Sequence, residues 1–291
     1  MSWRPALAAA LAVAGCHDRR ADSAPPAPAA ATGGDCVATT YPTDLDVPEA
    51  SGAAWLPDVQ RLLVVADSGH DGAYVEVDAA GAIVGRGRLP LGDAGDDLEG
   101  LARDGDQVWG LTSSGWMMAW RRAGDGYGLT AAFALDDTCG RTTVNCGANY
   151  EGLCLAPRPL ADGCDGYAAA KTTGELVCLH RGGPGFVLDR GKRYHVTGGG
   201  RLADCAIADD GTVWTGDNGF GLAQTRQLAV GPDGARLLGE AHLGLGFPEV
   251  LAFGPDHVVY RFSDLGGSPS LATAFRCPAG LPKAGPDPAG G

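Results

Sequence analysis

The sequence predicts an all-β protein, built as a single β-propeller of about five four-stranded blades. Three observations lead to this prediction: an abundance of turn-forming residues, a segment that returns about every fifty residues, and a lack of long stretches with helical periodicity. The 291 residues include 47 Gly and 19 Pro, which favour short strands joined by tight turns. Four short strands in each repeat are typical of propeller blades. A sixth, degenerate blade stays an alternative.

The repeat consists of a polar residue, a run of about four small or apolar residues, and a turn. A second apolar run follows each turn, as in 62–66 and 108–111, and a third run follows in segments such as 73–78. A β-sandwich would not explain why a polar residue returns at the head of every unit. These heads, spaced by 48, 52, 53 and 45 residues, are Ser51, Glu99, Glu151, Asp204 and Glu249.

Residues 1–15 read as a lipoprotein signal peptide. Arg4 precedes an apolar run over 5–14, which is too short to span a bilayer. The run ends in Val13-Ala14-Gly15-Cys16, which is similar to a bacterial lipobox and predicts lipidation of Cys16. An ordinary signal peptide with an incidental Cys is the alternative. Residue 17 is His and not Asp, so we expect the outer membrane or cell surface of a bacterial envelope and not the inner membrane.

Residues 16–35 read as the lipidated Cys and a flexible linker, because 21–34 is rich in Ala, Pro and Gly and has nothing to bury. The formal charge of the whole chain is −13. Such an acidic chain argues against nucleic acid as a partner and suits cations. We therefore expect a membrane contact through the lipid, a small molecule, a glycan or an envelope protein as partner, and a monomer.

Eight cysteines remain besides Cys16, an even number that favours disulfides in an exported protein. Cys139 and Cys146 bracket one loop and are expected to pair. The last unit has only three clear strands, and a strand at 36–41 lies upstream of the first unit. If that strand completes the last blade, Cys36 and Cys277 face each other and close the ring. The propeller would then cover 36–283, with a disordered tail at 284–291. Three pairings stay open for Cys154, Cys164, Cys178 and Cys205.

The first strand of each blade lines the channel of a propeller, so the five polar heads should form a ring at one mouth. Alternation places the residues two positions earlier on the same face; these are Glu49, Asp97, Asn149, Leu202 and Phe247. Neighbouring carboxylates need protons, basic partners or a cation, and oxygen ligands suit Ca²⁺. A water-filled channel with hydrogen-bonded acids is the alternative. The predicted Ca²⁺ ligands are Glu49, Glu99, Glu151, Asp204 and Glu249.

The second strands return to the same mouth, and their ends carry polar residues that folding does not require. Lys171 and Arg261 would either form salt bridges with the acidic ring or bind an anionic part of a ligand. His70 lies near this mouth as a possible general base or as a solvated loop residue. The predicted ligand-binding residues are Asp67, Thr112, Lys171, Asp217, Asn218 and Arg261.

The sequence resembles the SdiA-regulated, phytase-like β-propellers. Their inner-strand motif Glu-Gly-Leu-Ala is similar to Glu99-Gly-Leu-Ala and Glu151-Gly-Leu-Cys, and the segment 61–69 looks like their strand 2–3 hairpin. Related motifs occur in strictosidine-synthase-like and arylesterase-like propellers. The resemblance implies an exported domain with Ca²⁺ in the channel, held by Glu99, Glu151 and Glu249. Ser51 and Asp204 depart from a complete ring of glutamates.

Two functions follow from these expectations. The first is a binding module at the cell envelope, whose mouth recognises a ligand or partner. The second is a Ca²⁺-dependent hydrolase of phosphate or carboxylic esters, in which the metal polarises the substrate and activates water. The sequence holds no G-x-S-x-G or H-E-x-x-H motif, which disfavours serine-hydrolase and zinc-protease chemistry.

Overall fold

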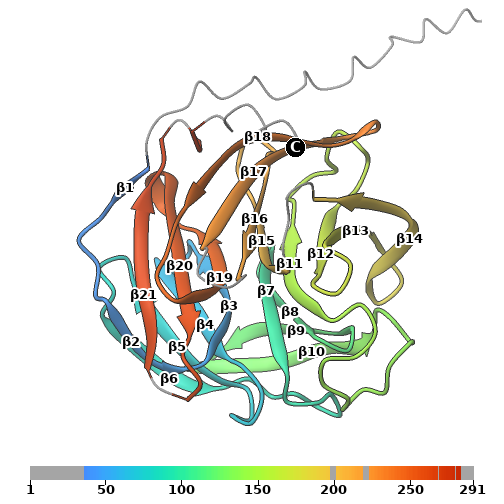
Figure 1. Ribbon diagram of the computed structural model, residues 1–291. Helices are drawn as coiled ribbons and strands as arrows, with labels where there is room; N and C mark the ends of the chain where they lie inside the picture. The colour runs from blue at the N-terminus through green and yellow to red at the C-terminus, as the bar shows by residue number, and fades with distance from the viewer. Residues whose placement is uncertain (1–35, 197–200, 219–222, 268, 279, 283–291) are drawn as a thin grey trace, which may run out of the picture.

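The computed structural model describes residues 36–196, 201–218, 223–267, 269–278 and 280–282. These residues form five antiparallel sheets arranged as the blades of a β-propeller (Figure 1). Among them the only helical element is the 3₁₀ turn η1 (Pro255–His257), and no helix is long and apolar enough to cross a membrane. The predicted leader, Cys16, the linker and the tail at 284–291 lie outside the described residues.

The five-blade prediction is confirmed, and each blade runs from an inner to an outer strand. Blade 1 holds β3 (Ala50–Leu56), β4 (Arg61–Ala66), β5 (Ala73–Asp78) and β6 (Ile83–Arg88). Blade 2 holds β7 (Leu98–Asp104), β8 (Gln107–Thr112), β9 (Trp116–Ala123) and β10 (Gly126–Ala134). Blade 3 holds β11 (Tyr150–Leu155), β12 (Gly166–Ala170), β13 (Glu175–Gly182) and β14 (Gly185–His195). Blade 4 holds β15 (Leu202–Ile207), β16 (Val213–Asp217), β17 (Gln224–Gly231) and β18 (Gly234–His242). Blade 5 begins with β19 (Phe247–Phe253), β20 (Val258–Asp264) and β21 (Pro269–Arg276).

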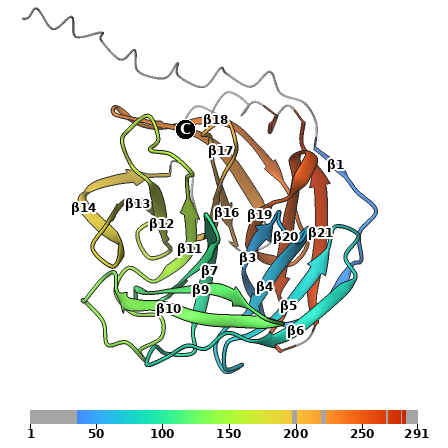
Figure 2. The ribbon, with the colours of Figure 1, turned by 180° about the vertical axis from the view of Figure 1, so that it is seen from behind.

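The start of the described chain completes blade 5 and closes the ring. Both β1 (Val37–Ala38) and β2 (Asp44–Pro48) pair antiparallel with β21, which Figures 1 and 2 show as blue strands beside a red one. Of the closing strand expected at 36–41, only residues 37–38 form β1, and the second closing strand β2 lies beyond the expected range. The predicted Cys36–Cys277 disulfide is present next to β1. It joins chain start to chain end, which restricts the unfolded chain strongly.

The other disulfides hold individual loops and neighbouring blades. The predicted Cys139–Cys146 bond is confirmed. Of the three open pairings, the structure has Cys154–Cys205 and Cys164–Cys178. The first of these links β11 to β15, so it fastens the inner strands of blades 3 and 4 to each other.

The hydrophobic core lies between the blades. Five clusters of buried side chains are present, and each combines residues of two neighbouring blades. For example, Leu62 and Val64 of blade 1 pack in one cluster with Val250 and Phe262 of blade 5. Burial of each such side chain contributes about 1.5–3 kcal/mol. The interfaces thereby fix the inner strands around the axis.

Candidate metal and ligand site at the mouth of the propeller

A β-bulge recurs near the start of every inner strand and presents one extra residue at the mouth. In blade 2, Leu98 pairs with Thr112 and Gly100 with Leu111, so Glu99 is left between them. The same irregularity recurs in all five blades. A bulge re-aims the side chain of its extra residue. The bulged residues, which we call the inner ring, are Ser51, Glu99, Glu151, Ala203 and Glu249.

This register corrects the place of Asp204, which the sequence repeat put in the inner ring. Ala203 is the bulged residue of blade 4, and Asp204 occupies the next position. Glycine stands there in blades 2 and 3 because the neighbouring inner strand is too close for a side chain. A Cβ on Gly100 would lie 2.4 Å from Leu153 N, for example. Asp204 instead accepts hydrogen bonds from Leu251 N and Cys205 N, both at 2.7 Å.

The second strand of each blade also brings a polar residue to the mouth. This residue directly follows the one that pairs with the residue before the bulge; in blade 2, for example, Leu98 before the bulge pairs with Thr112, and Ser113 follows Thr112. In blade 5 this residue is Asp264 and not Arg261, because Arg261 pairs with Leu251 farther along the blade. Counting two positions back from Ala203, the inner-ring residue of blade 4, likewise leads to Arg201, whereas the sequence pattern suggested Leu202. The second-strand set is Asp67, Ser113, Lys171, Asn218 and Asp264.

Three acids of blades 1 and 2 meet at the mouth and form what we call the tri-acid cluster: Asp67, Asp97 and Glu99. One carboxylate oxygen of each lies within 4.8 Å of the others. Asp97 and Glu99 are only 3% and 5% exposed. Ser113 Oγ donates to Asp97, and Ser68 N donates to Asp67 Oδ1 at 2.5 Å. No hydrogen bond or ion pair to the Glu99 carboxylate is found among the described residues.

The other two glutamates of the inner ring share a basic partner. Lys171 Nζ lies 2.8 Å from Glu151 Oε2 and 3.8 Å from Glu249 Oε1. Asn218 Nδ2 also donates to Glu249 Oε1, at 2.6 Å. The salt-bridge alternative for Lys171 therefore matches the geometry. The mouth is divided into a half neutralised by Lys171 and the tri-acid cluster, which no described basic side chain contacts.

Burial and the proximity of other carboxylates raise the pKa of several acids at the mouth. Burial, together with the charges of Glu151, Asp67 and Asp97, raises the pKa of Glu99 well above its usual value. Burial raises the pKa of Asp97 to about 7 despite the hydrogen bond from Ser113. Burial also raises the pKa of Glu249 to about 7, although Lys171 opposes the shift. Ionising all of these carboxyl groups at the mouth is therefore energetically costly unless a cation is bound.

Two polar residues precede the inner ring in left-handed backbone conformations, which non-glycine residues adopt rarely. Asn149 has φ 50° and Glu49 has φ 48°. Asn149 Nδ2 donates to Glu151 Oε1 at 2.8 Å, while its Oδ1 is buried without a hydrogen-bond partner among the described residues. Glu49 Oε2 instead lies 2.8 Å from His70 Nε2. His70 is thereby engaged by a carboxylate at the rim.

Three residues predicted to bind ligand have internal partners instead. Arg261 is fully buried, and its guanidinium donates to the carbonyls of Val250 and Pro248 at 2.9 and 3.2 Å. Asp217 Oδ2 lies 3.0 Å from Arg226 Nη1, and both side chains are buried. Thr112 Oγ1 accepts a hydrogen bond from Trp116 N within its turn.

Sequence reasoning noted Asp97 on the channel face but left it out of the metal set, and it missed Asp264. Alternation within β7 already places Asp97 beside Glu99. Asp264 follows Glu249 by fifteen residues, the interval that also separates Asn218 from Ala203. The corresponding intervals in blades 1, 2 and 3 are 16, 14 and 20 residues, so the repeat alone does not mark Asp264. The place of Asp264 becomes apparent only from the strand register.

No protein-family model matches the sequence, and no curated protein matches it either. Solved structures match at the level of fold. A glutaminyl cyclase from Myxococcus xanthus has a TM-score of 0.56 at 15% identity, over 84% of this chain and 99% of that one. A gluconolactonase from Xanthomonas campestris has a TM-score of 0.50 at 14% identity, over 86% and 92%. Both are β-propeller proteins, and the likeness shows the fold alone.

Proposed function

We propose that this propeller binds Ca²⁺ at the tri-acid cluster and uses the loaded mouth to bind a ligand or partner at the cell envelope. The observation that carries the proposal is the convergence of Asp67, Asp97 and Glu99 within 4.8 Å. Three buried or half-buried acids this close cannot all ionise without compensation. A divalent cation supplies that compensation.

The distribution of basic groups supports this position for the cation. Lys171 is engaged by Glu151 and Glu249, and Arg261 donates to backbone carbonyls. Neither side chain contacts the tri-acid cluster. A cation between blades 1 and 2 would therefore meet three carboxylates without having to displace a bound ammonium or guanidinium group.

The donor set suits Ca²⁺ in particular, which takes six to eight oxygen ligands in flexible geometry. The tri-acid cluster supplies carboxylate oxygens, and Asn149 adds a buried amide oxygen with no partner among the described residues. The hydrogen bond from Asn149 Nδ2 to Glu151 fixes which end of the amide is the acceptor. Such an oxygen in an acidic mouth is a candidate ligand. Asp204, which the sequence repeat included, is left out because backbone N–H groups already occupy both its oxygens.

Thermal unfolding after chelation tests the proposal, with Ca²⁺, Mg²⁺ or Zn²⁺ then titrated back. A ligand at about one hundred times its Kd stabilises the folded state by about 2.7 kcal/mol. For a chain of this size that corresponds to a rise in Tm of roughly 5–11 °C. We expect a saturable rise for Ca²⁺ that Glu99→Gln abolishes. The matched control is Asp264→Asn at the same rim, which should keep the response; no response to any cation in the unmodified protein would contradict the proposal.

The envelope location rests on the leader and on the disulfides. The lipobox-like segment ending at Cys16 would supply the anchor, residues 16–35 the tether, and the four disulfides suit an oxidising compartment. Substitution Cys16→Ser should release the protein from the membrane fraction and prevent incorporation of a labelled fatty acid. Unchanged labelling in that variant would contradict lipidation at Cys16.

A second candidate function is Ca²⁺-dependent hydrolysis of carboxylic or phosphate esters. The observation that favours it is Glu249, a mouth carboxyl whose pKa of about 7 suits general acid–base catalysis. The Xanthomonas campestris neighbour is named a gluconolactonase, and a lactone is a carboxylic ester. Hydrolysis of gluconolactone, p-nitrophenyl acetate and p-nitrophenyl phosphate should then require Ca²⁺ and fall in Lys171→Met and Glu249→Gln. Activity that survives chelation and both substitutions would not come from this mouth.

A further inference from the structure

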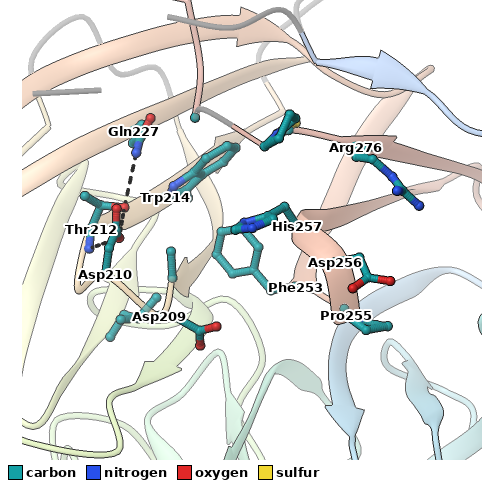
Figure 3. A pocket seen from close by; sticks show the side chains of 16 residues that line it. Asp209, Asp210, Thr212, Trp214, Gln227, Phe253, Pro255, Asp256, His257 and Arg276 are labelled. Carbon is teal, nitrogen blue, oxygen red and sulfur yellow. Dashed lines mark hydrogen bonds between the residues drawn. The ribbon is translucent and has the colours of Figure 1, made fainter. Parts of the chain in front are cut away.

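A second cavity lies at the opposite end of the strands, between blades 4 and 5 (Figure 3). Its volume is about 1000 Å³, at the upper end for small-molecule sites. It is lined by the turn after β15, by residues 253–257 after β19 and by the closing segment at 276–278. None of these segments contributes to the mouth, so this cavity is a separate feature of the molecule.

The middle of the cavity is aromatic and contains an unused hydrogen-bond donor. Trp214 is 2% exposed and packs edge-on against Phe253, with ring centroids 5.2 Å apart. Its Nε1 is buried and has no acceptor among the described residues. Trp109, at the equivalent position of blade 2, also lacks an acceptor among the described residues, but it packs against Phe186 and does not line this cavity. A buried N–H without an acceptor favours a ligand that brings an oxygen.

Acidic side chains lie on one side of this aromatic middle, and an arginine lies beside an acid on the other side (Figure 3). Figure 3 shows Asp209 and Asp210 on one side, and Arg276 with Asp256 on the other. Asp210 Oδ1 accepts from Thr212 N and Oγ1, at 2.9 and 2.7 Å. Asp209, Asp256 and Arg276 form no ion pair within the described part of the chain. The cavity therefore offers Asp209 on one side and Arg276 on the other without an ion pair among the described residues, and Asp210 beside Asp209 with one oxygen bonded to Thr212 (Figure 3).

We propose that this cavity binds a short peptide as a zwitterion. The α-ammonium would lie at Asp209 and Asp210, an apolar side chain on Phe253, and the carboxylate at Arg276, which can bind it through two parallel hydrogen bonds. A peptide carbonyl would accept from Trp214 Nε1. An extended tripeptide spans roughly 10 Å, and its alternating donors and acceptors match the mixed lining. The site works without the cation at the mouth.

The test uses the peptide Ala-Phe-Ala, its N-acetylated form and its C-terminal amide, with binding measured by calorimetry on the full-length protein. Partly exposed ion pairs contribute 0.2–1 kcal/mol, so blocking either end should weaken binding up to about fivefold. In Asp209→Asn the acetylation penalty should disappear while the amidation penalty stays. In Arg276→Gln the reverse should hold. This crossed pattern assigns each end of the peptide to one end of the cavity.

Tryptophan fluorescence locates the bound peptide. Trp214→Phe should remove the fluorescence change on binding, and the matched variant Trp109→Phe should keep it. Binding should also survive chelation and Glu99→Gln, which separates this proposal from the one for the mouth. Equal binding of free and blocked peptides, no binding at millimolar concentration, or sensitivity to one block only would overturn the zwitterion assignment.

Discussion

Substitution Asp97→Asn should stabilise the metal-free protein at neutral pH while removing its response to Ca²⁺. Burial raises the pKa of folded Asp97 to about 7, against an ordinary value of 3.8. The folded state therefore holds a proton that the unfolded chain releases near pH 4, and stability falls as pH rises from about 4 to 7. At 1.36 kcal/mol for each pH unit, the full penalty above pH 7 is about 4 kcal/mol. Asparagine removes this penalty and keeps an oxygen that accepts from Ser113.

Thermal and urea unfolding in the presence of a chelator measures this effect. The stability gain of Asp97→Asn should be about 2–4 kcal/mol at pH 8 and roughly half of that at pH 5.5. Asp106→Asn is the matched control, because Asp106 is exposed and pairs with Arg121 at the surface; its change should stay below about 1 kcal/mol. A gain that is equal at both pH values, or a loss of stability at pH 8, would refute the claim that buried charge is the cause. With Ca²⁺ at about one hundred times its Kd, the advantage of the variant should shrink by about 2.7 kcal/mol, because the variant loses a metal ligand.

Three further predictions concern the parts that surround the tri-acid cluster. Lys171→Met should destabilise the chelated protein at pH 8 by about 3 kcal/mol, because Glu151 loses its buried partner. It should also raise Ca²⁺ affinity in calorimetry, because a positive charge that interacts with Asp67 and Glu99 is removed; an unchanged or weaker affinity would contradict this electrostatic effect. Arg261→Met should lower the free energy of unfolding by about 2–5 kcal/mol, since buried carbonyls lose their donor; an unchanged urea midpoint would contradict this. Replacing Cys36 and Cys277 by Ser should lower the free energy of unfolding by up to about 4–5 kcal/mol. An unchanged Tm would show that strand pairing alone closes the ring.

The fold could be predicted from the sequence because each blade repeats the same short sequence pattern. A polar head, an apolar run and a turn recur with nearly constant spacing, and the odd strand at the start is matched by a missing strand at the end. The pairing of Cys36 with Cys277 follows from that closure. The division of the closing segment into β1 and β2 was not predicted, although Asp44-Leu-Asp-Val alternates polar and apolar residues and the structure buries Leu45 and Val47.

The site could be predicted only in part, because a bulge shifts the register where the functional residues stand. Counting from the repeat put Asp204 in line with Glu99, whereas the hydrogen-bonding register puts Ala203 there. The same one-residue ambiguity exchanges Leu202 with Arg201. A one-residue shift in a strand moves a side chain to another face. Comparing the repeats by eye therefore identifies the correct blade but selects the residue next to the one that lies at the mouth. Arg261 was misplaced for another reason: β20 continues past Arg261 to Asp264, where the turn with Gly266 and Gly267 begins.

The inner ring also explains why a cation would bind away from the centre of the channel. Blade 4 contributes Ala203, whose side chain has no ligand atom, and Lys171 pairs with Glu151 of blade 3 and lies 3.8 Å from Glu249 of blade 5. Among the described residues, the carboxylates of the tri-acid cluster in blades 1 and 2 have no basic partner, and in blade 5 the same holds for Asp264 at the rim. Five similar blades thus carry an asymmetric mouth. A ligand attracted by the cation would approach over blades 1 and 2.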